Sequence, residues 1–79
     1  MNILAYNIIR KMIENPLEVE YRKYGLTGSL YIKGVYILHI FKFRYSDTFL
    51  SRDNNLSSNE LKKILDVVEY CEAIKIRNL

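Results

Sequence analysis

The side chains best suited to catalysis or metal binding are histidine and cysteine, and the sequence holds one of each, His39 and Cys71. A catalytic histidine needs a nucleophile or a carboxylate beside it, and a metal ion needs several ligands. The sequence supplies no second histidine, no cysteine pair and no carboxylates at a matching spacing. We therefore expect no catalytic, metal or cofactor site, no small-molecule ligand and no enzymatic activity.

Both residues fit a hydrophobic core instead. His39 stands in the largely apolar run 35–43, on the face that we expect to be buried. Cys71 follows Val68 at helical spacing, and nothing nearby would lower the pKa of its thiol, which predicts a small buried side chain. A ribonuclease-like toxin, another class of small basic protein, would need an acid, a base and a phosphate-binding group that these residues do not supply.

Basic residues interleaved with tyrosines offer a different chemistry, because such surfaces can follow phosphates and stack on bases. The net charge of +3 is mild, and Glu18 and Glu20 share the face concerned, so nucleic-acid (RNA) binding is the alternative function here. Lys62 and Lys63, in the first turn of the second expected helix, could also meet phosphate. The basic and aromatic residues of the expected sheet are Arg22, Tyr24, Tyr31, Lys33, Tyr36, Lys42 and Arg44.

The elements that position these side chains follow from the spacing of apolar residues. Residues 2–15 place apolar side chains at three-to-four spacing, which predicts an amphipathic helix capped by Asn2 and ended by Pro16. Residues 17–24 alternate in polarity and predict a first strand. The turn at residues 25–28 and the two-residue turn Lys33-Gly34 then predict three antiparallel strands.

The turns also predict which side chains share a face. With Lys33-Gly34 as a two-residue turn, Ile32 lies opposite Val35, Tyr31 opposite Tyr36 and Leu30 opposite Ile37. Pairing of Tyr24 with Ser29 would place Arg22 opposite Tyr31 and Glu20 opposite Lys33. The expected core face is then Leu30, Ile32, Val35, Ile37, His39, Phe41 and Phe43, and the expected outer face includes Tyr31, Tyr36, Leu38, Ile40, Lys42 and Arg44.

The rest of the chain predicts a loop and a second helix. Residues 46–55 are polar, and Phe49 and Leu50 within them could form a short strand. A capping box at residues 57–60 starts a helix that we expect to end near Glu72. Residues 73–77 alternate again, which predicts a possible short edge strand. The 79 residues thus predict one small α+β domain, 1–79, of helix, three-stranded antiparallel meander and helix (αβββα).

This order of elements is similar to that of double-stranded RNA-binding domains, which carry lysines at the start of their second helix, as Lys62 and Lys63 stand here. The turn at residues 25–28 lacks the Pro and His of those domains, and the second helix is built on Leu, Ile and Val rather than Ala. The similarity is therefore one of element order alone.

The outer face with Tyr36, Leu38 and Ile40 predicts the function. An apolar patch rimmed by basic residues is typical of a protein-docking site, with Tyr and Arg as common anchors. We expect a non-enzymatic module that forms a homodimer or docks on a larger protein. The composition, rich in Asn, Ile, Lys and Tyr and poor in Ala, is typical of AT-rich genomes and favours a phage or mobile-element inhibitor of a host protein or defence complex. Without a secretory signal or a membrane segment, we expect it in the cytoplasm.

Overall fold

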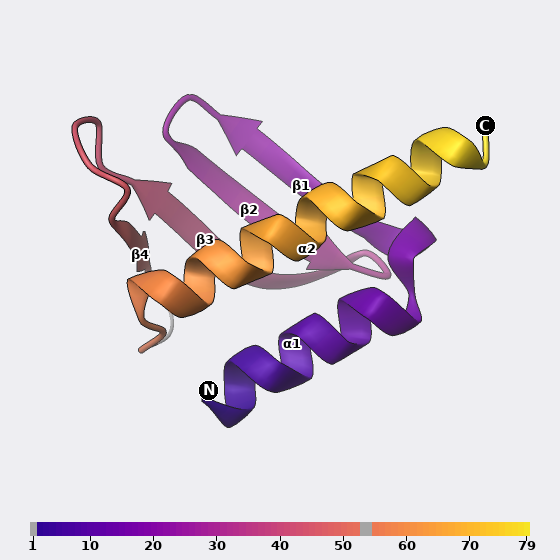
Figure 1. Ribbon diagram of the computed structural model, residues 1–79, viewed down its shortest axis with the longest axis horizontal. Helices are drawn as coiled ribbons and strands as arrows, with labels where there is room; N and C mark the ends of the chain where they lie inside the picture. Colours follow the sequence, from indigo (N-terminus) through magenta and orange to yellow (C-terminus); the bar gives the residue numbers. More distant parts are fainter. Residues whose placement is uncertain (1, 53–54) are drawn as a thin grey trace.

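The computed structural model describes residues 2–52 and 55–79 and has two layers, a four-stranded antiparallel sheet and a pair of helices on one of its faces (Figure 1). The strands lie in the order β1-β2-β3-β4. The predicted α+β fold is confirmed, with the fourth strand short. The elements are α1 (Ile3–Glu14), the 3-10 turn η1 (Pro16–Glu18), β1 (Val19–Tyr24), β2 (Thr27–Ile32), β3 (Val35–Lys42), β4 (Phe49–Ser51) and α2 (Ser58–Arg77).

Helix α1 begins and ends where the sequence predicts. The Asn2 side chain accepts a hydrogen bond from the backbone N–H of Leu4, and Asn15 closes the last turn. The expected start of the first strand at residue 17 is wrong. Pro16 opens η1 because its fixed φ suits the first position of a helical turn, so β1 begins only at Val19.

Two tight turns connect the first three strands. Gly25 (φ +56°) allows a two-residue turn between β1 and β2, so Tyr24 pairs with Thr27 and not, as expected, with Ser29. Consequently Arg22 pairs with Ser29, and Glu20 pairs with Tyr31. The shift of two residues leaves every side chain on its expected face, because side chains alternate with a period of two.

The second turn is as predicted, but the strand after it is not. Lys33 (φ +53°) and Gly34 (φ +76°) form the two-residue turn, and Ile32 pairs with Val35. Beyond the Tyr31–Tyr36 pair the register shifts, so that Leu30 pairs with Leu38 instead of Ile37. This β-bulge adds one residue to β3, and one extra residue moves every later side chain to the opposite face.

The bulge reverses the faces expected for the second half of β3. Leu38 (0% exposed) and Ile40 (1% exposed) lie in the core, so their expected place on the outer face is wrong. His39 and Phe41 lie on the outer face, so their expected place in the core is also wrong. Two further residues of the expected core, Val35 and Phe43, are exposed, and Ile37 is half-buried against the core.

Strand β4 pairs with the end of β3 and starts the connection to α2. Phe49 pairs with Lys42, and Ser51 with Ile40, so the segment that we expected to be a loop contains a short strand, the alternative considered for Phe49 and Leu50. Residues 53–54 of that segment lie outside the described residues.

Helix α2 begins at the predicted capping box. The Ser57 side chain accepts from the backbone of Glu60, whose carboxylate accepts from the backbone of Ser57 at 3.0 Å and of Asn2 at 2.7 Å. The edge strand considered for residues 73–77 is wrong, since α2 continues to Arg77. No Gly or Pro interrupts it, and Lys75 and Arg77 in its last turn suit the negative end of the helix dipole.

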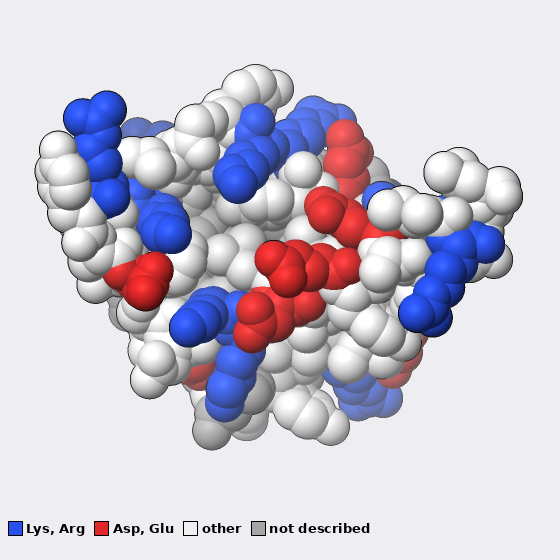
Figure 2. Space-filling model, turned by 45° about the horizontal axis from the view of Figure 1, so that its top comes forward, with Lys and Arg blue, Asp and Glu red and all other residues white. Residues whose placement is uncertain are grey.

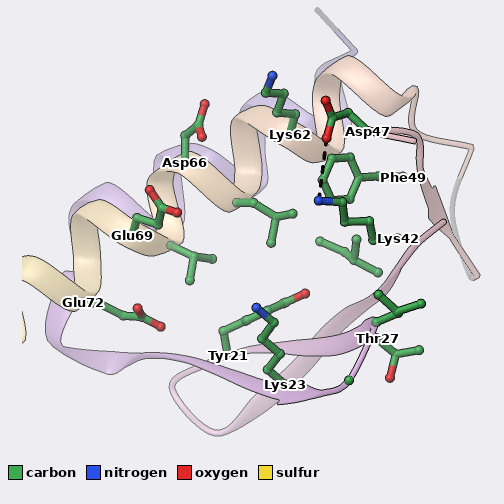
Figure 3. A pocket seen from close by; sticks show the side chains of 15 residues that line it. Tyr21, Lys23, Thr27, Lys42, Asp47, Phe49, Lys62, Asp66, Glu69 and Glu72 are labelled. Carbon is green, nitrogen blue, oxygen red and sulfur yellow. Dashed lines mark ion pairs between the residues drawn. The ribbon is translucent and has the colours of Figure 1, made fainter. Parts of the chain in front are cut away.

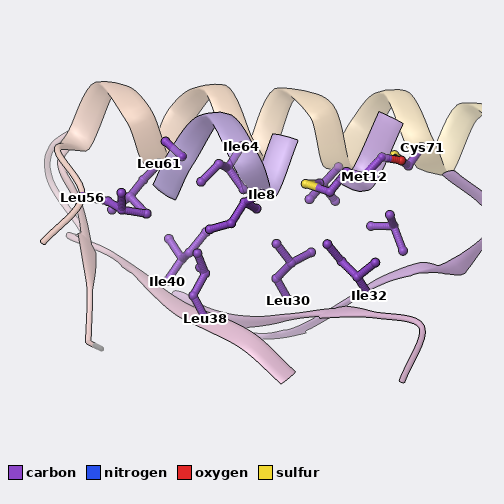
Figure 4. Packing of buried hydrophobic residues seen from close by; sticks show 13 residues of the cluster. Ile8, Met12, Leu30, Ile32, Leu38, Ile40, Leu56, Leu61, Ile64 and Cys71 are labelled. Carbon is purple, nitrogen blue, oxygen red and sulfur yellow. The ribbon is translucent and has the colours of Figure 1, made fainter. Parts of the chain in front are cut away.

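The core lies between the sheet and the two helices. Figure 4 shows Leu30, Ile32, Leu38 and Ile40 pointing from the sheet toward the helices. Cys71 is buried there, as predicted; its Sγ lies 3.6 Å from the Met12 carbonyl oxygen, and burial raises the pKa of the thiol. The buried side chains are Ala5, Ile8, Met12, Val19, Leu30, Ile32, Leu38, Ile40, Leu56, Leu61, Ile64, Val68 and Cys71.

Candidate interaction surfaces

The sheet face turned away from the helices carries a group of aromatic side chains. Both helices pack on the other face, so neither covers it (Figure 1). Tyr36 is 46% exposed, Phe41 36% and Leu50 48%. We call this surface the outer aromatic face and define it by the residues Tyr24, Tyr31, Tyr36, His39, Phe41, Phe43 and Leu50.

Contacts along and between the strands hold several of these side chains in place. Tyr31 and Tyr36 meet edge to face at a centroid distance of 5.8 Å, and Phe41 and Phe43 do the same at 5.4 Å. His39 Nδ1 and Ser29 Oγ share a hydrogen bond of 3.0 Å across β2 and β3. The outer aromatic face is therefore built largely from rings whose positions are fixed before any partner arrives.

Few charged side chains lie on this face. Arg22 lies over the ring of Tyr31, 4.3 Å from its centroid, and its Nε donates to Glu20 at 2.9 Å. The guanidinium lowers the pKa of the Glu20 carboxyl, and the carboxylate raises the pKa of Arg22. These are the outward-facing charges within the four strands. Arg52, directly after β4, lies beside His39 and Phe41 and takes part in no ion pair within residues 2–52 and 55–79. The surface is therefore aromatic, with a small excess of positive charge.

A groove of about 540 Å³ lies on the helical side of the sheet, between α2 and the β1–β2 hairpin (Figure 3). Its apolar lining comes from both layers and includes Tyr21, Ile40, Phe49, Leu65 and Val68. Burial raises the pKa of the Tyr21 hydroxyl, which points into the groove. Ile40 and Val68 also belong to the buried core, so the groove borders the core directly.

The rim of the groove separates two kinds of charge. Acidic side chains of α2, Asp66, Glu69 and Glu72, line one side, and Lys23 of β1 lies across from them (Figure 3). The space-filling view shows acidic side chains gathered together, with basic ones around them (Figure 2). At one end Lys42 Nζ lies 3.6 Å from Asp47, with Lys62 close by. Within residues 2–52 and 55–79, Asp66, Glu69 and Glu72 take part in no ion pair.

The structure separates the residues that the sequence suggested for protein binding. Tyr31 and Tyr36 lie together on the outer aromatic face, whereas Leu38 and Ile40 are core residues. Lys42 was expected on the outer face but points into the groove, because it follows the bulge.

Arg44, the remaining residue of that set, lies in the exposed turn after β3. The residues suggested for nucleic-acid binding are also spread apart. Arg22 belongs to the outer face, Lys33 to the β2–β3 turn, Lys62 to the groove and Lys63 to the exposed side of α2.

Sequence reasoning missed the contribution of His39, Phe41, Phe43 and Leu50 to the outer aromatic face. Strict alternation from the Lys33-Gly34 turn assigns the first three to the core. The signal that could have corrected it is side-chain type, since the alternative face, with Leu38 and Ile40, is aliphatic and better suited to pack beneath helices.

Comparison of the chain with protein-family models, with curated proteins and with solved structures gave no match. Of the described helices, neither is long and apolar enough to cross a membrane. The described residues also hold no group of three or more His, Cys, Asp or Glu side chains that could bind a metal ion.

Proposed function

We propose that this protein is a non-enzymatic protein-binding module that docks through its outer aromatic face. The observation that carries the proposal is the set of partly exposed rings on a sheet face that neither helix covers. Aromatic side chains are enriched at protein interfaces, where they bury much area and lose little conformational freedom. Exposed apolar surface of this kind commonly marks an interaction site.

Electrostatics favours a protein partner over nucleic acid. Binding to a phosphate backbone depends on unpaired Lys and Arg. On the outer aromatic face the Arg22 guanidinium is engaged by Glu20, and Arg52 is one cation there that has no ion pair in the described part of the chain. One such cation is few for a phosphate-binding surface. Lys42 and Lys62 lie on the opposite side of the sheet, at the groove. A near-neutral aromatic surface suits the centre of a protein interface, which is depleted in charge.

Docking is proposed for the face of the sheet, not for its edge. Strand β1 is an edge strand, and Lys75 of α2 donates a hydrogen bond to the carbonyl of Val19 at that edge. β1 also carries the positively charged Arg22 and Lys23. Charged residues on an edge strand discourage another strand from pairing with it.

The partner is either a second copy of the chain or a larger protein. A near-neutral face can meet its own copy without charge repulsion, as an isologous dimer requires. The AT-rich composition favours the finer proposal of a phage or mobile-element inhibitor that occupies a host protein. A buried, unpaired cysteine is compatible with the cytoplasm, the location we propose.

The test compares a variant of the outer aromatic face with a matched variant of the helical layer. Tyr36→Ser combined with Phe41→Ser removes two rings from the face, and Tyr70→Ser removes an equally exposed ring from α2. Self-association is measured by analytical ultracentrifugation over a range of concentrations. Capture from a host lysate is measured in parallel with wild type and both variants, after circular dichroism has verified their folding.

We expect association, with itself or with a captured protein, to fall by at least about tenfold in the double variant, because truncating an interface anchor commonly costs 2 kcal/mol or more. Tyr70→Ser should retain it. A wild-type protein that stays monomeric and captures nothing would refute the proposal. Equal association of all three proteins would refute it as well.

RNA binding stays the second candidate, because the Arg22 guanidinium lies over the Tyr31 ring, and tyrosine rings and guanidinium groups are both groups on which bases stack. Titration of single- and double-stranded RNA at two salt concentrations decides between the two. Affinity that falls steeply with salt and is lost in Tyr31→Ala would favour RNA. Absence of binding at low salt would remove this candidate.

A further inference from the structure

The helical layer covers only part of the sheet's inner face. Helix α1 packs along one flank of α2, and the groove runs along the other flank, over the β1–β2 hairpin (Figures 1 and 3). The groove therefore occupies the position that a third helix would take in this layer. Helices that pack side by side lie about 8–10 Å apart, so the α2 side chains at this flank are those that a third helix would contact.

The floor of the groove is apolar and held in shape by the sheet. The ring of Tyr21 lies across Gly28, where an added Cβ would come within 2.1 Å of Tyr21 Cζ. This close approach lets the ring lie flat against β2 and leaves the space above it open. Leu65 and Phe49, both half-buried, complete an apolar strip that a partner's apolar side chains could cover.

The rim adds a charge pattern with a helical repeat. Asp66, Glu69 and Glu72 follow one another at intervals of three residues, which corresponds to about 4.5 Å along the axis of α2. In the part of the chain that the structure describes, none of them forms an ion pair. By contrast, Lys42 already has Asp47 at 3.6 Å.

We propose that the groove binds an amphipathic helix of a partner protein, with the helix's apolar side on the floor and its Lys or Arg side chains toward Asp66, Glu69 and Glu72. Basic residues three and four positions apart on a helix share one face and match the axial repeat of these carboxylates. Extended chain repeats at about 6.6–6.8 Å per two residues and matches it less well. The three carboxylates of the α2 side also repel phosphate, which favours a basic peptide over nucleic acid along that side of the groove.

This binding site lies on the opposite side of the sheet from the outer aromatic face. The two proposals use no residue in common, so either can fail while the other stands. A protein with both sites could hold two partners, or two parts of one partner, at once.

The test uses three synthetic 18-residue peptides as probes. The first has a Leu face flanked by Lys at three-to-four spacing, the second replaces each Lys with Glu, and the third is a scramble of the first that has no apolar face. Binding to the full-length protein is measured by calorimetry, and the contact surface is mapped by NMR chemical-shift changes of backbone amides.

Two charge variants of equal net charge separate the groove from general attraction. The groove variant carries Asp66→Asn, Glu69→Gln and Glu72→Gln. The control carries Glu14→Gln and Glu18→Lys, at two exposed carboxylates away from both the groove and the outer aromatic face. Each raises the net charge from +3 by three, so any difference between them reports the position of the charges.

We expect saturable binding of the amphipathic Lys peptide alone, with shift changes centred on Leu65, Glu69 and Lys23. The groove variant should bind it at least about tenfold more weakly, and the control less than about threefold more weakly. No saturable binding, equal binding of the scramble or the Glu peptide, or equal weakening in both variants would overturn the proposal. Shift changes confined to the outer aromatic face would overturn it too. Self-association in ultracentrifugation that the groove variant abolishes would also overturn it, because a second copy of the chain would then occupy the groove.

Discussion

The two faces of the sheet differ in side-chain type as well as in burial. The inner face presents Leu30, Ile32, Leu38 and Ile40 to the helices, and these branched aliphatic side chains are buried. The outer face presents tyrosines, phenylalanines and a histidine, which stay partly exposed. Aliphatic side chains fill a core without leaving polar atoms to satisfy, whereas Tyr and His carry groups that stay hydrated until a partner covers them.

One bulged residue in β3 assigns the side chains to these faces. Before it Tyr36 points outward, and after it Leu38 and Ile40 point inward while His39 and Phe41 point outward. A regular strand would have buried His39 and exposed Leu38. A short apolar run can therefore supply side chains to two sheet faces of different chemistry when a bulge sets its register.

The largest effect on stability is expected for a substitution on the buried inner face. Leu38→Ala should lower the free energy of unfolding by about 2–5 kcal/mol, because it leaves a cavity in a fully buried site. His39→Ala on the neighbouring position should cost less than about 1.5 kcal/mol, the price of one hydrogen bond to Ser29. Urea unfolding of both variants measures the difference. Equal losses of unfolding free energy in the two variants would contradict the assignment of Leu38 to the core and His39 to the outer face.

A second inner-face prediction concerns the floor of the groove. Gly28→Ala should destabilise by about 1–3 kcal/mol, because its Cβ would collide with the Tyr21 ring and force it to move. The double variant Tyr21→Leu, Gly28→Ala should show a positive coupling, with Gly28→Ala costing less when the ring is gone. A double-mutant cycle by urea unfolding checks this. Additive costs would show that the ring does not rest on Gly28.

The smallest effect on stability concerns Glu60, whose carboxylate joins the N-terminal ends of α1 and α2. Hydrogen bonds from the backbones of Ser57 and Asn2 lower the pKa of Glu60 from its ordinary value of 4.5. A pKa that is lower in the folded state contributes stability above the unfolded pKa, and the contribution is lost as pH falls through the folded pKa.

Glu60→Gln should therefore reduce stability near neutral pH, and the difference from wild type should shrink as the pH falls below the ordinary value of 4.5. Thermal unfolding across this pH range measures it. A difference that stays constant with pH would show that the carboxylate charge is not what links the starts of α1 and α2.

Local signals in the sequence predict much of the fold. The Asn2 cap, the capping box at Ser57 and the Lys33-Gly34 turn depend on residues close together in the chain, and the structure confirms each. The bulge depends on how β3 packs beneath two helices that are distant in sequence. In a run that is apolar at both odd and even positions, alternation alone cannot decide which set is buried.

The candidate surfaces were predictable to different degrees. As the sequence predicts, the helices leave one sheet face uncovered, and Tyr31 and Tyr36 lie on that face. Its other members could not be assigned without the bulge. The groove depends on the angle at which α2 crosses the sheet, which does not follow from residue spacing.

The most direct test of the central claim is NMR solvent accessibility along β3, measured with a soluble paramagnetic probe. The account predicts broadening of His39 and Phe41 side-chain signals in the free protein, with Leu38 and Ile40 protected. When the outer aromatic face is occupied, at self-associating concentration or with the captured partner added, His39 and Phe41 should become protected as well. Broadening of Leu38 and Ile40, or His39 and Phe41 signals that stay equally accessible in the complex, would contradict the account.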